Sequence, residues 1–237
     1  MVKFQKLSKS KFQNLSLYLF FLFIAFIGIL YGNSIKSNFL FLRIWDPINL
    51  AFLALGFPFL IIQRKTGIPD FLEKRISNNS RFLQPIIIGF LFGLLDIFVF
   101  KIILHPQPYE ELPPFLQPFP YSLFLFFSGA LEIEVFYRLI PLSLFLIFGN
   151  WFFQGKYHTT FFVIGAILTS IREPLEQLPQ GSLILIIYCF TSGFIMNYIQ
   201  AIYIKKYGFL ATFSIRLSHY FLWHILLGIY VQFIELS

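Results

Sequence analysis

The chain has 237 residues, of which 57% are hydrophobic and only 12% are charged. Soluble domains carry about 25% charged residues, so a chain with half that share has too little polar surface to face water on every side. This composition excludes a soluble enzyme and a disordered tail, and the single cysteine, Cys189, excludes an internal disulfide framework. The net charge is +7, and the Lys and Arg residues lie beside apolar runs and do not form a basic stripe. This placement favours lipid headgroups over nucleic acid as partners.

Apolar runs recur along the chain, and a bilayer crossing takes about 20 such residues. They lie at residues 15–31, 44–62, 82–104, 119–148, 159–171, 183–204 and 209–234, and the last is either one long helix or two pieces. A proline-rich segment at 105–118 is predicted to be a loop, since proline does not continue a helix. The sequence therefore predicts an all-α fold, a polytopic transmembrane helical bundle of about seven to eight spans.

Basic residues indicate how the bundle is oriented, because Lys and Arg gather in cytoplasmic loops. Residues 1–14 hold four lysines, whereas the loop at 105–118 contains Glu110 and Glu111 but no Lys or Arg. We expect residues 1–14 to be a basic cytoplasmic N-terminus, 15–118 to hold three transmembrane helices, and 119–237 to form the core. The expected location is the cytoplasmic membrane of a prokaryote, with the N-terminus inside.

Ionisable side chains inside predicted spans are costly in a bilayer and are commonly functional. In the fourth span, Glu134 and Arg138 are four residues apart, so they share a helix face and can pair, whereas Glu132 points about 200° away. His219 lies at a similar depth in the last span, and we expect it to meet both carboxylates in a hydrated cavity near mid-membrane. Asp96 in the third span is open to a structural or a functional interpretation.

A carboxylate, an imidazole and a water molecule in a protein-lined cavity are suited to amide hydrolysis. The base removes a proton from the water, and the imidazole or arginine stabilises the oxyanion and the leaving group. A zinc site normally needs three protein ligands. The sequence has no His-Glu-x-x-His, and His219 and His224 lie about 140° apart around a regular helix. We therefore predict no metal and no cofactor.

These residues resemble the signature of the CPBP family of intramembrane proteases, also called the CAAX protease or abortive-infection family. That family carries Glu-Glu-x-x-x-Arg in one helix, Phe-x-x-x-His in the next and a His-x-x-x-Asn-like motif in a later one. Glu134 and Arg138 match the second Glu and the Arg, and His219, which follows a helix-opening Gly208, is similar to the late histidine. The resemblance covers residues 129–227. It implies a membrane endopeptidase that cuts prenylated tails, leader peptides or small membrane proteins.

The sequence departs from the family pattern at three positions. Ile133 stands at the first Glu, with Glu132 one residue before it, Arg172 stands at the middle His, and Trp223 replaces the Asn, with His224 beside it. The resemblance implies that Glu134 is the base or supports it, that Glu132 substitutes for the missing Glu, and that Arg138 orients them. It assigns His219 to the oxyanion or acid role, and His224 and Arg172 are possible accessory residues.

Two other functions remain open from the sequence. The departures at Ile133 and Arg172 fit a non-catalytic member that keeps the scaffold and binds membrane proteins, as an assembly, immunity or regulatory factor. A transporter or channel would use Asp96, Glu132 and Glu134 as a relay, although no internal repeat of the kind found in transporters is visible. The expected partners are the lipid bilayer and a peptide or small membrane protein, either as substrate or as binding partner.

Overall fold

The computed structural model describes residues 9–39 and 41–237. In these residues all regular secondary structure is helical, as predicted. The α-helices are α1 (Lys9–Ile35), α2 (Pro47–Leu53), α3 (Gly56–Ile62), α4 (Gln84–Asp96), α5 (Tyr121–Glu134), α6 (Ile140–Phe153), α7 (His158–Glu176), α8 (Leu183–Tyr207), α9 (Phe209–Tyr220) and α10 (Leu227–Tyr230). Short 3-10 or π segments extend them: η1 (Lys36–Asn38), η2 (Gln63–Thr66), η3 (Asn79–Leu83), η4 (Ile97–Leu104), η5 (Val135–Leu139), η6 (Phe221–Leu226) and η7 (Val231–Glu235).

Each predicted apolar run is helical. The run 44–62 is divided into α2 and α3 by a turn at residues 54–55, and the other differences are at the ends. The first helix begins at Lys9, inside the segment 1–14 that was predicted as a basic N-terminus, and residues 1–8 of that segment lie outside the described residues. The last run is one continuous helix, formed by α9, η6, α10 and η7. The segment 105–118 is a loop as predicted, and Lys101 holds it by donating to the Gln107 carbonyl at 2.7 Å.

Proline and glycine set several of the helix boundaries. Pro47 occupies the first turn of α2, where the backbone N–H that proline lacks would have no partner within the helix. The backbone N–H of Asp46, the residue before Pro47, donates to Asn49 Oδ1 at 2.9 Å. Pro141 follows the π segment η5, because its ring cannot fit the regular helical turn before it. Gly208 separates α8 from α9 with φ of 83°, and a Cβ there would lie 3.0 Å from the Pro69 carbonyl oxygen.

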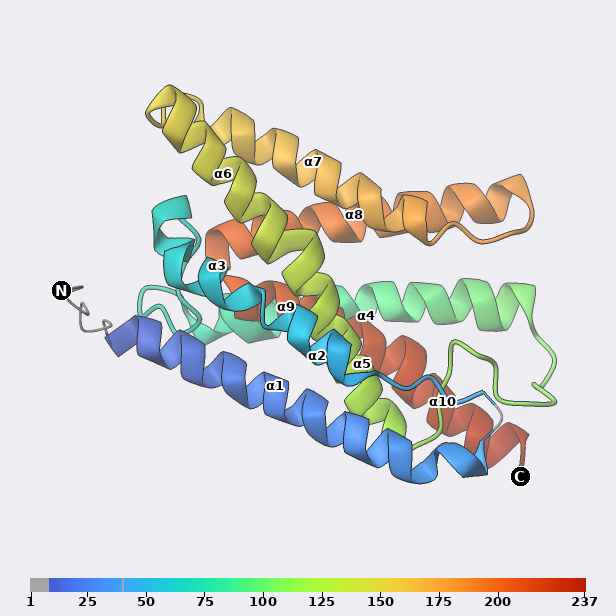
Figure 1. The fold of residues 1–237 in the computed structure, drawn as a ribbon. Coiled ribbons are helices and arrows are strands. Elements are labelled where there is room, and N and C mark those ends of the chain that lie inside the picture. The colour runs from blue at the N-terminus through green and yellow to red at the C-terminus, as the bar shows by residue number, and fades with distance from the viewer. Residues whose placement is uncertain (1–8, 40) are drawn as a thin grey trace.

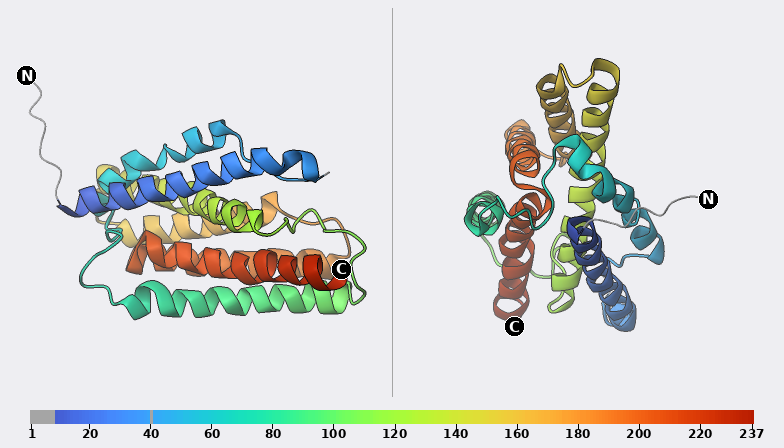
Figure 2. Two further views of the ribbon diagram at one scale, coloured as in Figure 1. Left: turned by 90° about the horizontal axis from the view of Figure 1, so that it is seen from below. Right: turned by 90° about the vertical axis from the view of Figure 1, so that its left-hand side faces the viewer.

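The helices form a bundle in which α9 lies at the centre (Figure 1). It packs against α4 on one side, α5 on another and α8 on a third, while α1 covers α5 and the α6–α7 hairpin extends past α8. Two further views show α4 and α9 side by side along their lengths (Figure 2). The turns gather at two opposite ends. One end holds the start of α1 and residues 63–83, 154–157 and 208, and the other holds residues 36–39, 41–46, 105–120 and 177–182 and the C-terminus.

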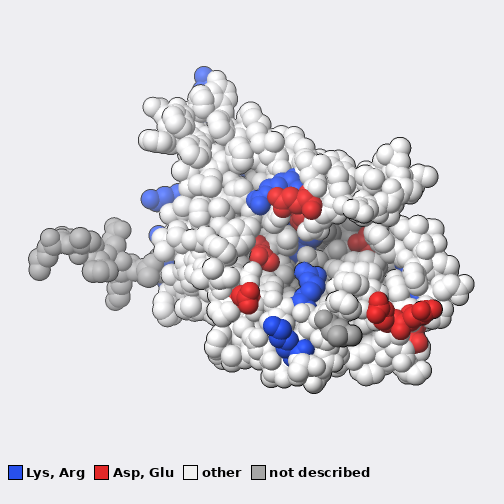
Figure 3. All heavy atoms as spheres, turned by 45° about the vertical axis from the view of Figure 1, so that its right-hand side comes forward, with Lys and Arg blue, Asp and Glu red and all other residues white. Residues whose placement is uncertain are grey.

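Five helical stretches are long and apolar enough to cross a membrane. They are Lys9–Asn38, Pro47–Thr66, Asn79–Leu104, Leu183–Tyr207 and Phe209–Glu235. The predicted count was seven to eight, and the two remaining long stretches, α5–α6 and α7, carry the buried charges described below. The face seen in Figure 3 is mostly uncharged, with acidic and basic side chains in a few separate places. Several apolar helices and a face with few charged side chains indicate an integral membrane protein.

A polar network joins the start of α1 to the loop after η2. Asn14 Nδ2 donates to Asp70 Oδ1 at 2.8 Å, and the backbone N–H of Phe71 donates to Asn14 Oδ1 at 3.0 Å. Gln63 Nε2 donates to the same Asp70 oxygen at 3.1 Å, and Arg64 forms an ion pair with Asp70. Asp70 is buried, so these contacts hold the first turns of α1 against the loop after η2.

We expect the stability conferred by Asp70 to depend on pH. Burial works against ionisation, but hydrogen bonds from Asn14, Arg64 and Gln63 outweigh it and lower the pKa of Asp70 below its ordinary value. Such a carboxylate stabilises the fold above its unfolded pKa of about 3.9, and the contribution is lost as pH falls through the folded pKa. The wild type should therefore lose thermal stability below about pH 4 more steeply than Asp70→Asn does.

Melting midpoints between pH 7 and pH 3 test this expectation. Glu110→Gln is the control, because Glu110 is an exposed carboxylate with no ion pair among the described residues. This variant should follow the wild-type curve. If Asp70→Asn were as sensitive to acid as the wild type, another group would have to account for the loss of stability.

Candidate functional site

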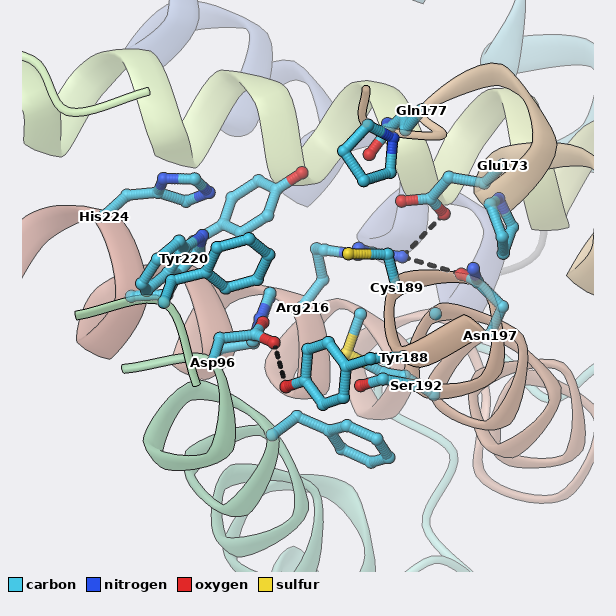
Figure 4. Close-up of a pocket in the computed structure, with 18 residues that line it drawn as sticks. Asp96, Glu173, Gln177, Tyr188, Cys189, Ser192, Asn197, Arg216, Tyr220 and His224 are labelled. Carbon is cyan, nitrogen blue, oxygen red and sulfur yellow. Dashed lines mark hydrogen bonds and ion pairs between the residues drawn. The ribbon is translucent and has the colours of Figure 1, made fainter. Parts of the chain in front are cut away.

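A cavity of about 250 Å³ lies between α4, the end of α7, α8 and α9 (Figure 4). Its polar lining comes from residues distant in sequence, which the fold brings together. These are Asp96, Glu173, Gln177, Tyr188, Cys189, Ser192, Asn197, Arg216, His219 and His224. The rest of the lining is apolar or aromatic and includes Phe92, Phe100, Pro174, Met196 and Trp223. A concave site with a few convergent polar groups in an apolar wall is the usual form of a ligand pocket.

One side of the cavity holds an aspartate and a histidine in direct contact. His219 Nε2 lies 2.7 Å from Asp96 Oδ2, and the hydroxyl of Tyr188 donates to Asp96 Oδ1 at 2.7 Å. Both oxygens of Asp96 are therefore used, and the carboxylate is fixed between α8 and α9. The tautomer that donates from Nε2 leaves the lone pair of His219 Nδ1 free, and no hydrogen-bond partner for Nδ1 exists among the described residues.

The other side of the cavity is organised by Arg216. Its Nη2 donates to Glu173 Oε2 and to Asn197 Oδ1, each at 2.8 Å. Because the oxygen of the Asn197 amide accepts from Arg216, its Nδ2 is the remaining donor, and it has no partner among the described residues. Asn197 is 1% exposed and His219 6% exposed. Buried polar atoms without hydrogen-bond partners are rare, and the residues that line the cavity hold three of them, these two and Arg216 Nε, which indicates a site that takes a further molecule.

Close packing of α4 on α9 brings Asp96 to His219. Gly89 and Gly93 lie four residues apart on α4, and a Cβ at Gly89 would stand 2.2 Å from the Ile215 carbonyl oxygen. A Cβ at Gly93 would stand 2.9 Å from the Cβ of Leu222. Small residues at this spacing allow two membrane helices to approach closely. Asp96 follows Gly89 by seven residues, so it lies on the same face of α4.

His224 also lines the cavity, which differs from the sequence expectation. On a regular helix, His219 and His224 would point about 140° apart. The chain here enters the π segment η6, whose wider turn brings residues five apart closer to the same side of the helix. The ring centroids of His219 and His224 are 6.5 Å apart. His224 Nδ1 lies 2.8 Å from the Phe115 carbonyl oxygen, and its ring stacks on Phe126 at 4.3 Å. These contacts hold His224 in place beside the cavity.

Glu134 does not line the cavity but lies behind it in a buried network. It accepts from Gln200 Nε2 and from Thr212 Oγ1, each at 2.5 Å. Arg138 and Arg216 both lie within 3.8 Å of its carboxylate, so the predicted i, i+4 ion pair with Arg138 is present. Glu134 is 0% exposed, and its carboxylate is a buried counter-ion that helps to hold Arg216 in place.

Two other sequence-predicted residues lie outside the cavity. Glu132 is half-buried on α5 and has no hydrogen bond or ion pair among the described residues, so the expected meeting of both acids with His219 is wrong. Arg172 is half-exposed and pairs with Glu176 at 2.8 Å. Arg138 lies with Glu134 in the network behind the cavity and also approaches Glu173 at 3.4 Å. Of the predicted residues, the cavity is lined by His219 and His224.

Glu173 and Asn197 line the cavity but were not among the residues predicted from the sequence. The predicted fifth span ended at residue 171, whereas α7 continues through Pro174 to Glu176 and brings Glu173 into the helix. Asn197 gave no signal, because an uncharged amide in an apolar run is not costly enough to stand out. No group of three His, Cys, Asp or Glu side chains among the described residues is placed to hold a metal ion.

Comparison with known proteins gave no match to a family model, to a curated protein or to a solved structure.

Proposed function

We propose that the chain is an intramembrane hydrolase that cleaves peptide bonds with water activated by His219. The observation that carries the proposal is the contact of 2.7 Å between His219 and Asp96 in a cavity that also holds the free amide donor of Asn197. This arrangement keeps the protease function implied by the resemblance to the CPBP family. The carboxylate that takes part in the proposed reaction is Asp96, in place of Glu132 and Glu134.

The residues suggest a simple sequence of steps. His219 Nδ1 removes a proton from a water molecule, and the resulting hydroxide adds to the carbonyl carbon of the substrate. Asp96, hydrogen-bonded to Nε2, stabilises the imidazolium, and Asn197 Nδ2 donates to the oxyanion. The imidazolium then returns the proton to the leaving amine as the bond to the carbonyl carbon breaks. Arg216 positions Asn197 and pairs with Glu173, each at 2.8 Å.

The wall of the cavity supports an apolar peptide segment as substrate. Phe92 and Phe100 on the α4–η4 side, Met196 on α8 and Trp223 on η6 provide apolar surface around the polar groups. Three of the stretches that are apolar enough to cross a membrane border the cavity, so a substrate can enter from the bilayer. They are Asn79–Leu104, Leu183–Tyr207 and Phe209–Glu235. We further propose that α5–α6 and α7 also cross, which gives seven spans with the N-terminus inside.

Cleavage of apolar fluorogenic peptides by the full chain in liposomes tests the proposal. His219→Gln is expected to lower the cleavage rate by about 10²–10⁴-fold, the usual contribution of a general base. Asp96→Asn should lower it strongly as well, and Asn197→Ala by about 10²–10³-fold as for an oxyanion donor. His105→Gln is the matched control, because His105 is exposed in the loop after η4 and does not line the cavity.

The proposal fails if His219→Gln and Asp96→Asn cleave the peptides at the wild-type rate. It also fails if the wild type, folded and inserted, cleaves none of a broad set of apolar peptides. Melting curves of each variant separate loss of chemistry from loss of fold.

A second function, a non-catalytic membrane binding protein, is favoured by the position of Glu134. This residue matches the family's motif, yet it is 0% exposed and saturated by Gln200, Thr212 and two arginines. Arg172, at the position of the family's middle histidine, lies half-exposed and paired with Glu176. A membrane protein that co-purifies in mild detergent, and whose binding is unaffected by His219→Gln, would support this second function.

A further inference from the structure

A second hollow, of about 520 Å³, lies at the end of the bundle where α1 begins. It is bordered by the first turns of α1, by η2 and by the loop after it. Its lining is formed by Lys9, Ser10, Gln13, Asn14, Arg64, Asp70, Leu72, Glu73, Lys74 and Arg75. Four basic side chains and two acidic ones therefore surround one space, and the surplus of charge is positive.

The two acidic side chains of this hollow are already engaged. Asp70 forms an ion pair with Arg64 and accepts from Asn14 at 2.8 Å, and Glu73 lies 3.9 Å from Arg64. Lys74 and Arg75 are exposed, and neither has a hydrogen bond or an ion pair with any described residue. The positive charge that faces the hollow is thus left without an internal counter-ion.

Apolar surface begins at the edge of the same hollow. Leu72 lines it and is 47% exposed. Gln13 lines it from α1, and Phe20, seven residues further along, lies on the same face of that helix and is 54% exposed. A ligand with an anionic head and a hydrocarbon tail would match both parts, the head at the cations and the tail along α1.

We propose that this hollow binds the phosphate of an anionic phospholipid headgroup. Lys74 and Arg75 contact the phosphate oxygens, and Arg64, held by Asp70, closes the site from the side of η2. The acyl chains lie against Leu72 and the exposed face of α1. The lipid is the source of the phosphate, because the hollow opens beside a helix that is long and apolar enough to span the membrane.

The test measures lipid binding to the purified full chain in neutral detergent by native mass spectrometry. Phosphatidylglycerol is titrated against phosphatidylcholine of the same chain length. The double variant K74Q/R75Q is expected to lower the affinity for phosphatidylglycerol by about tenfold or more. The control, K65Q/K206Q, removes two exposed lysines that do not line the hollow, and it should bind as the wild type does.

Each outcome decides the proposal. Selective loss in K74Q/R75Q supports it, whereas equal loss in both double variants means that only diffuse surface charge attracts the lipid. Equal binding of the two lipids by the wild type overturns it. Millimolar inorganic phosphate that displaces phosphatidylglycerol would assign the hollow to free phosphate and also overturn it. Peptide cleavage and melting curves of K74Q/R75Q should stay unchanged, which separates this site from the proposed hydrolytic one.

Discussion

Glu134→Gln is expected to lower the free energy of unfolding by about 3–5 kcal/mol, the cost of breaking a buried ion pair by removing one partner. Glu134 and Glu173 face Arg138 and Arg216 in a region with almost no exposure. Without the charge of Glu134, two buried guanidinium groups share one carboxylate. Glu132→Gln is the matched control two residues away, and it should change stability by about 1 kcal/mol or less, since Glu132 has no ion pair among the described residues.

Unfolding in mixed micelles, followed by tryptophan fluorescence, measures both variants. The double variant E134Q/R138M should recover much of the loss, because one carboxylate then faces one guanidinium again. If Glu134→Gln were instead as stable as the wild type but unable to cleave peptides, Glu134 would act in the chemistry, as the family motif implies. The experiment therefore distinguishes a support for Arg216 from a base.

Interactions within one helix were predictable from the sequence. The spacing of Glu134 and Arg138 predicted an ion pair, and the two groups lie 3.8 Å apart. The length of the apolar runs predicted helices, and the prolines of residues 105–118 predicted a loop. These features depend on helical periodicity and backbone chemistry, which are local properties.

The pairing of residues on different helices could not be derived in this way. Asp96 and His219 are 123 positions apart in the chain, and their contact exists because α4 packs closely on α9. Nothing local to Asp96 indicates that partner. His224 enters the cavity because a π segment changes the angle between residues five apart, and no feature of its sequence neighbourhood signalled that segment. The helices were therefore predictable from the sequence, whereas the acids that share a cavity with His219 were not.

Gly89→Ala is expected to destabilise the protein by about 1–3 kcal/mol and to stop peptide cleavage. The added Cβ would lie 2.0 Å from Ser218 Oγ and 2.2 Å from the Ile215 carbonyl oxygen. The hydroxyl can rotate, but the carbonyl belongs to the backbone of α9, so α4 must move away by about 1 Å or more to reach ordinary contact distances. Asp96 moves with α4, and a hydrogen bond of 2.7 Å to His219 does not survive such a shift.

The control for this variant is Gly129→Ala on α5, where the nearest atom to the new Cβ is Tyr220 Cε2 at 3.7 Å. Alanine favours a helix over glycine by about 0.5–1 kcal/mol, so this variant should be as stable as the wild type or slightly more stable. Replacing glycine by alanine is thus expected to lower stability at Gly89 but not at Gly129. The difference comes from the close contact of Gly89 with the backbone of α9. If Gly89→Ala were as stable and as active as Gly129→Ala, close packing of α4 on α9 would not be what holds Asp96 against His219, and the proposed base would lose its orienting partner.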